Sequence, residues 1–193
     1  MGKQWDRIFR QYGKVFTKVQ EDIPKIVRLF KKRKVKRVLD LGCGSGRHLI
    51  YLAKRGFKVY GIDIAPEGIE IARNWLKKEG LKADLKVGSV YKRLPYKDNF
   101  FDAVISTQVI HHARIETIRK AIKQIERVLK PNGLIFMTVR KRKFLKRWLK
   151  FKIVKVNSKV KKGELLRWGF ATKYKIVGPR SYIPIDGREE RLI

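Results

Sequence analysis

The sequence is poor in cysteine, histidine and long apolar runs, and each shortage excludes a class of protein. With one cysteine, Cys43, the chain has no intramolecular disulfide framework and is compatible with a reducing compartment. Three histidines and one thiol argue against a zinc site. No apolar run approaches the length of a membrane-spanning helix, and the N-terminus lacks the apolar core of a signal peptide. We therefore expect a cytoplasmic protein with no metal site and no transmembrane segment.

Acidic residues are also scarce, since 17 Asp and Glu face 49 Lys and Arg, which gives a formal net charge of +32. Such a field attracts polyanions. One basic cluster covers 31–37, and a denser one, Arg140 to Lys162, has Phe144, Trp148 and Phe151 interleaved. Cations for phosphates and rings for bases predict non-specific nucleic-acid binding through residues 140–162. The alternatives are an amphipathic helix with a solvated basic face, an anionic membrane surface and the Lys-rich composition of a thermophile.

The most informative segment is a glycine-rich turn that follows an apolar run. Val38 to Leu41 reads as the end of a buried strand, and Gly42, Gly44 and Gly46 follow before an amphipathic helix. Because glycine has no Cβ, a ligand can approach such a backbone closely. The spacing is G-x-G-x-G, whereas the dinucleotide fingerprint needs glycine where an arginine stands. Asp40, two residues before the first glycine, suits a ligand that carries positive charge, such as a sulfonium or an amino group.

Four further segments follow in order. A strand ends in the acid Asp63, about 20 residues after the glycines, where an acid is placed to accept ribose hydroxyls. The others are 86–90, 94–106 with an Asn-Phe-Phe-Asp run, and 128–134 with a Pro-Asn-Gly turn. Over about residues 35–139 the chain resembles the class I S-adenosylmethionine-dependent methyltransferases of the methyltransferase type 11 group. Residues 94–112 also resemble the tRNA wobble-uridine methyltransferases.

The resemblance implies S-adenosylmethionine as cofactor and a set of residues that bind it. Ser89 stands where the family usually has an acid that bonds the adenine amino group, and it brings no charge. The set is Asp40, Gly42, Gly44, Gly46, Asp63, Ile64, Ser89, Val90 and Ser106. Alternatively, the glycines only tighten the turn, Asp63 caps a helix, and Ser89 is a simple turn residue.

Alternating strands and helices predict a Rossmann-like α/β fold, a doubly wound and mostly parallel sheet of at least five strands with helices on both faces. The expected strands are 37–41, 58–62, 84–87, 101–106 and 134–139, and the expected helices are 47–55, 66–78 and 116–129, with one or two more between 5 and 33. We divide the chain into an N-terminal helical cap (1–34), a cofactor-binding core (35–139) and a basic C-terminal extension (140–193).

The segment after the fourth strand supplies the catalytic candidates Gln108, His111 and His112. The family commonly lines the cofactor and acceptor here, and a histidine is a base near neutral pH. Alternatively, one histidine packs under the sheet and the other caps a helix. The acceptor is then a small molecule or RNA, and a third hypothesis is a non-enzymatic binder. Trp5, Tyr12 and Phe16 are candidates for a lid over the cofactor, or for one packed helix face.

The C-terminal third departs from the family pattern. The family adds a helix and an antiparallel strand pair after its fifth strand, whereas this chain becomes basic and irregular after position 139. We expect a shortened protein without that pair. The exposed edge would then need a cover, either a partner subunit in a homodimer or a helix over 144–151.

Overall fold

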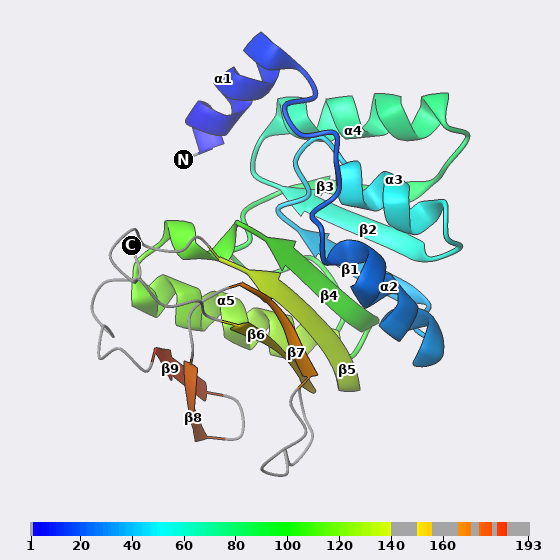
Figure 1. Ribbon diagram of the computed structural model, residues 1–193. Helices are drawn as coiled ribbons and strands as arrows, with labels where there is room; N and C mark the ends of the chain where they lie inside the picture. The colour runs from blue at the N-terminus through cyan, green and yellow to red at the C-terminus, as the bar shows by residue number, and fades with distance from the viewer. Residues whose placement is uncertain (1, 140–149, 156–165, 171–173, 179–180, 185–193) are drawn as a thin grey trace. The chain divides into compact units, whose positions relative to one another are not determined.

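The computed structural model describes residues 2–139, 150–155, 166–170, 174–178 and 181–184. The chain divides into two compact units, Met1–Lys92 and Arg93–Ile193, and each is described by itself. Figure 1 shows the elements of both. The division into a cap, a core and an extension stays a prediction.

The first unit alternates helices and strands. Two parallel pairings join its strands in the order β3-β2-β1. Its elements are α1 (Gly2–Tyr12), α2 (Ile23–Lys32), β1 (Arg37–Leu41), α3 (Arg47–Ala53), β2 (Lys58–Asp63), α4 (Pro66–Lys78) and β3 (Ala83–Val87). The two helices α1 and α2 confirm the one or two expected between 5 and 33, although α1 begins at Gly2. From β1 onward the elements lie within two residues of the predicted ones, and α4 has the predicted bounds because Pro66 suits its first turn and Gly80 lies beyond its end with a positive φ.

The core of the first unit forms where strand and helix faces are apolar. Leu39 and Leu41 of β1, Ile62 of β2, Leu49 of α3 and Ile69 of α4 are all at most 1% exposed. Helices α3 and α4 pack on β2, and α4 also packs on β3. Helix α1 lies beside α4, as Figure 1 shows. The apolar core therefore fixes the carboxyl ends of β1 and β2, where the predicted site residues lie.

The second unit contains one mixed group of strands and one hairpin. Strand β5 pairs parallel with β4 and antiparallel with β6, β6 pairs antiparallel with β7, and β8 pairs antiparallel with β9. The elements are β4 (Phe101–Thr107), the 3₁₀ helix η1 (Ile110–His112), α5 (Ile115–Val128), β5 (Leu129–Thr138), β6 (Lys150–Lys155), β7 (Leu166–Phe170), β8 (Tyr174–Gly178) and β9 (Ser181–Pro184). Parallel strands that alternate with helices in both units confirm the α/β class.

Strand β5 starts earlier than the sequence predicts. Leu129 pairs with Phe101 and Leu134 pairs with Ala103, so a bulge absorbs the residues between them. Within this bulge Asn132 has a φ of +61°, and a Cβ on Gly133 would lie 2.6 Å from the Leu129 side chain. The Pro-Asn-Gly segment therefore lies inside β5 as a bulge, and not before the strand as predicted.

The expectation that the final antiparallel pair is missing is wrong. Leu134 and Ile135 of β5 pair with Lys155 and Val154 of β6, and β7 continues beyond β6. The edge of β5 is therefore occupied, which removes the reason for a covering partner subunit. Lys150 and Phe151, predicted to end a helix, lie in β6. The basic cluster otherwise falls mainly on 140–149 and 156–162, outside the described residues. None of the helices in the described part of the chain has the length and hydropathy that crossing a bilayer requires.

Candidate functional site

The glycine turn between β1 and α3 is built from left-handed backbone. Gly42, Gly44 and Gly46 have φ angles of +76°, +51° and +92°, which L side chains rarely adopt. The N–H of Gly42 donates to the carbonyl of Ile62 at 2.8 Å, and the N–H of Gly46 donates to the carbonyl of Cys43 at 3.0 Å. These bonds anchor the turn to β2 and close it immediately before the helix.

Two glycines are also required by close neighbours. A Cβ on Gly44 would lie 3.2 Å from the ring of Phe9, and one on Gly46 would lie 2.9 Å from the Cβ of Ala72. The ring of Phe9 would also lie 2.9 Å from a Cβ on Gly68 of α4. Helix α1 therefore packs its one buried ring against the turn and against the start of α4.

Asp63, at the end of β2, is bonded to the same turn. Its Oδ2 accepts the N–H of Gly44 at 2.8 Å and its Oδ1 accepts the N–H of Ala65 at 2.9 Å. Each carboxylate oxygen has a second lone pair, so two acceptor directions remain for a diol. Burial raises the pKa of Asp63 above its ordinary value, while the N–H bonds from Ala65 and Gly44 lower it and the charge of Asp40 raises it. The two N–H bonds therefore fix the position of the Asp63 carboxylate and leave it able to accept further hydrogen bonds.

Asp40 is a buried carboxylate with spare acceptor capacity. The residue is 1% exposed, and neither of its oxygens accepts a hydrogen bond from the part of the chain that the structure describes. Nδ1 of His48 lies 3.7 Å from Oδ2 of Asp40. A buried carboxylate without hydrogen bonds is costly, and such groups mark sites completed by a ligand or a water molecule. Asp40 therefore fits a cationic group, as S-adenosylmethionine would supply.

Cys43 lies inside the turn and has no exposed thiol. Burial raises its pKa well above the ordinary value, and the negative charges of Asp40 and Asp63 raise it further. A thiol that holds its proton is a poor nucleophile. Among the described residues, no three His, Cys, Asp or Glu side chains come together as metal ligands.

The loop after β3 completes the first unit's share of the predicted site. The N–H of Gly88 donates to the carbonyl of Asp63 at 2.8 Å, and the hydroxyl of Ser89 accepts the N–H of Tyr91 at 3.2 Å. Val90 is buried, whereas Ile64 is 38% exposed. Ser89 thus has a turn-forming role, and its adenine contact stays a prediction.

The remaining candidates belong to the second unit. Ser106 is buried at the end of β4, and His111 is half-buried in η1, which also contains His112. Gln108 is exposed and has a φ of +61°, held by bonds from its N–H to the carbonyl and the hydroxyl of Thr138 at 2.8 and 3.1 Å. A non-glycine residue in this conformation is strained, and such strain is common at functional sites.

The packed helix face predicted for three N-terminal rings is wrong for two of them, whereas their role as a lid stays a prediction. Tyr12 and Phe16 are 65% and 47% exposed, whereas Phe9, one helical turn after Trp5, is the buried ring. Sequence analysis also missed Asp6, whose Oδ1 accepts the N–H of Glu67 at 2.9 Å and so caps α4. The i, i+4 spacing of the two rings was the available signal for Phe9. No local pattern indicates Asp6.

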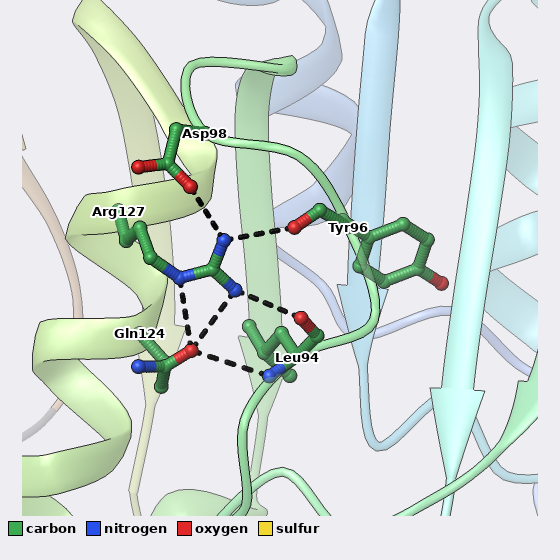
Figure 2. Close-up of polar contacts among 5 residues, drawn as sticks. All are labelled: Leu94, Tyr96, Asp98, Gln124 and Arg127. Atoms are coloured by element: carbon green, nitrogen blue, oxygen red, sulfur yellow. Dashed lines mark hydrogen bonds and ion pairs between the residues drawn. The ribbon is translucent and has the colours of Figure 1, made fainter.

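A second cluster that the sequence did not reveal surrounds Arg127 of α5, shown in Figure 2. One guanidinium nitrogen donates to the carbonyl of Tyr96 and to the carboxylate of Asp98, and the other donates to the carbonyl of Leu94. The distances are 2.8, 2.7 and 2.8 Å. Gln124 accepts from the same guanidinium and from the N–H of Leu94. This side chain therefore holds the loop that leads into β4.

Comparisons with known proteins agree with this geometry. Norajmaline N-methyltransferase from Rauvolfia serpentina is 36% identical over 106 residues, which are 53% of this chain and 35% of that protein. A ubiquinone biosynthesis O-methyltransferase from Xanthomonas axonopodis pv. citri is 34% identical over 102 residues, 53% of this chain and 42% of that protein. The matched segment thus spans well under half the length of these curated relatives.

Solved structures show the same fold. The PH0226 protein from Pyrococcus horikoshii matches with a TM-score of 0.58 and 27% identity over 84% of both chains. An S-adenosylmethionine-dependent methyltransferase from Methanosarcina mazei matches with a TM-score of 0.53 and 30% identity, over 58% of this chain and 55% of that one. The strand orders 3-2-1 and 4-5 of the two units are those of the Rossmann-like methyltransferase fold, as predicted. The methyltransferase domain family (Methyltransf_11) matches residues 39–137, and this chain belongs to that family, whose methyl donor is S-adenosylmethionine.

Proposed function

We propose that this chain binds S-adenosylmethionine on the glycine turn and transfers its methyl group to a small-molecule acceptor. The observation that carries the proposal is the pair of buried carboxylates in the first unit. Neither oxygen of Asp40 accepts a hydrogen bond from a described residue, and Asp63 is held by two N–H groups at the end of the adjacent strand. The carboxylate of Asp40 suits a cation, and that of Asp63 suits the two hydroxyls of a ribose. A sulfonium nucleoside carries both groups.

Each site residue then has a role that its position allows. Asp63 accepts the ribose hydroxyls, and Asp40 faces the positively charged methionine end. The glycines let the cofactor approach the backbone, and Ser89 and Val90 line the adenine side. Ile64 is exposed beside Asp63 and covers the sugar. The contact of Ser106 with the cofactor stays a prediction.

When bound, the cofactor supplies a methyl group already activated by positive sulfur, so the protein has to align the acceptor and exclude water. Alignment within about 3–3.5 Å accounts for much of the rate of such displacements. Gln108, exposed and strained after β4, is the proposed contact to the acceptor. His111 or His112 takes a proton where the acceptor must lose one.

The small-molecule class is supported by the relatives, which are named for acting on norajmaline and in ubiquinone biosynthesis. RNA is a second candidate, and a specific observation favours it. The end of α2 exposes cations that form no ion pair with any described residue. They are Arg28, Lys31, Lys32, Arg33 and Lys34. Such a surface on a chain of net charge +32 suits phosphates, with residues 140–162 as an additional non-specific site.

Two measurements test these proposals. Calorimetry with S-adenosylmethionine and its demethylated product tests the cofactor site, and no heat with either would contradict it. Transfer of labelled methyl groups into a metabolite extract, but not into bulk RNA, supports a small-molecule acceptor, and the reverse supports RNA. Binding of the cofactor without transfer to either indicates a non-enzymatic binder. The cytoplasmic location stays a prediction.

A further inference from the structure

A histidine that no motif of the sequence predicts lies beside Asp40, whose carboxylate accepts no hydrogen bond within the described segments. His48 is the second residue of α3, and its side chain is 3% exposed. Its Nδ1 lies 3.7 Å from Oδ2 of Asp40. This distance is too long for a hydrogen bond, but it is short enough for the ring dipole to interact strongly with a buried carboxylate charge.

The other ring nitrogen of His48 fixes its protonation. Nε2 accepts the backbone N–H of Gln20 at 3.3 Å, so Nε2 carries no proton. The neutral ring then holds its hydrogen on Nδ1, directed at Asp40. A second proton on Nε2 would face the N–H of Gln20, donor against donor. The segment between α1 and α2 therefore occupies Nε2 and leaves Nδ1 as the ring nitrogen that faces Asp40.

The same segment is anchored at two further points. The guanidinium of Arg47 donates to the carbonyl of Lys18 at 3.1 Å and lies 5.1 Å from the ring centroid of Phe16. The amide of Gln20 also donates to the buried carboxylate of Asp22 at 3.1 Å. The contacts of Arg47 and His48 therefore hold the segment that contains Gln20 beside α3.

We propose that His48 is a positioning residue for Asp40, which it holds as a full anion aimed at the positive charge of the cofactor. This inference rests on the proposed cofactor site. A neutral N–H donor orients the carboxylate without cancelling its charge, whereas a histidinium would neutralise it. Arg47 is a cation whose pKa is lowered by burial and raised by the charge of Asp40, and its guanidinium already donates to the carbonyl of Lys18. The negative charge of Asp40 therefore stays available for the ligand.

Two nearly isosteric substitutions separate the two ring nitrogens. His48→Asn places an amide nitrogen at the position of Nδ1 and keeps the donor that faces Asp40. His48→Gln places its amide group near the position of Nε2, where the amide oxygen accepts the N–H of Gln20, and loses the donor toward Asp40. We expect His48→Asn to retain cofactor affinity within about threefold and His48→Gln to lose about tenfold, since an N–H dipole directed at a buried charge contributes on this order in a medium of low dielectric constant.

The charge of the ligand provides the decisive readout. S-adenosylmethionine and S-adenosylhomocysteine carry a charged amino group, whereas methylthioadenosine carries no charge and shares the ribose and the adenine. If His48 positions Asp40, His48→Gln weakens the first two ligands and leaves methylthioadenosine unchanged. Equal loss for all three means that His48 is only a packing residue, and no loss for any of them also overturns the proposal.

Nitrogen NMR of the unsubstituted protein gives an independent test. The imidazole of His48 should show the spectrum of the neutral Nδ1–H tautomer before and after ligand addition, and a charged ring in the complex would overturn the proposal. If the unsubstituted protein binds none of the three ligands, the proposed cofactor site itself fails, which is a separate result from a failure of His48 alone.

Discussion

The carboxylate of Asp63 lies 2.8 Å from the backbone nitrogen of Gly44, so the end of β2 is joined directly to the middle of the glycine turn. The same residue's other oxygen accepts the N–H of Ala65 at the approach to α4. One acid therefore fixes the positions of two loops. Because the Asp63 carboxylate is already held in position, a ligand that bonds to it loses less free energy to ordering the side chain.

Substitution of Asp63 by Asn should weaken cofactor binding about a hundredfold, because an amide cannot accept two hydroxyl hydrogens while it also serves two N–H groups. Calorimetry with S-adenosylhomocysteine measures the loss. Asp84→Asn, which changes an exposed carboxylate on β3 in the same unit, is the matched control and should leave affinity unchanged. Equal affinity in Asp63→Asn would remove the ribose role.

Cofactor affinity should also depend on pH in the acid range. Burial raises the pKa of Asp63 above 3.8, so the free protein keeps this proton to a higher pH than an ordinary aspartic acid does. Ribose hydroxyls donate to the ionised form, and affinity therefore rises with pH up to the pKa of the free protein and is level above it. Below that pKa the affinity should fall about tenfold per pH unit.

The same titration with Asp63→Asn serves as the control, since that variant has no proton to lose at this position. Its residual affinity should be flat over the range in which the unsubstituted protein changes. A profile of the unsubstituted protein that is flat from about pH 4 to about pH 7 would contradict the raised pKa.

Local patterns predicted most of the first unit. Leu39 and Leu41, Pro66 and the glycines each constrain their own neighbours, so the positions of β1, α4 and the turn follow from the sequence. Helix α5 covers 115–128 where 116–129 was predicted, because its apolar spacing is regular.

The failures all concern contacts between distant residues. Asp6 caps α4 across 61 positions, and His48 meets Gln20 across 28. Neither pairing leaves a periodic trace in the sequence. The early start of β5 depends on a bulge opposite Phe101, and the strand pair beyond β5 is hidden by a basic composition that is typical of a solvated extension.

Arg127→Ala should destabilise the protein by about 3 kcal/mol, because the guanidinium satisfies two loop carbonyls and a carboxylate that would be left without it. Arg127→Lys should recover little of this, since an ammonium cannot span the same acceptors. Urea unfolding measures both variants. Arg119→Ala removes an exposed pair with Glu116 on the same helix and should cost less than about 0.5 kcal/mol.

Gly46→Ala and Gly56→Ala form a matched pair that separates backbone strain from crowding. The two glycines have φ angles of +92° and +85°, but a Cβ on Gly56 would meet nothing within 4 Å, whereas one on Gly46 would lie 2.9 Å from the Cβ of Ala72. Gly56→Ala should therefore cost only the strain, about 1–2 kcal/mol. Gly46→Ala should cost a further 1–3 kcal/mol, roughly, from overpacking against α4.

A double-mutant cycle with Ala72→Gly identifies the source of that further cost. If Gly46 is required by the approach of α4, removal of the Ala72 methyl group should return at least about 1 kcal/mol in the Gly46→Ala background, beyond the helix-propensity loss of Ala72→Gly alone. Thermal or urea unfolding of the four proteins gives the coupling energy. Additive costs would show that the turn tolerates a Cβ beside α4, and that only the φ of Gly46 requires glycine.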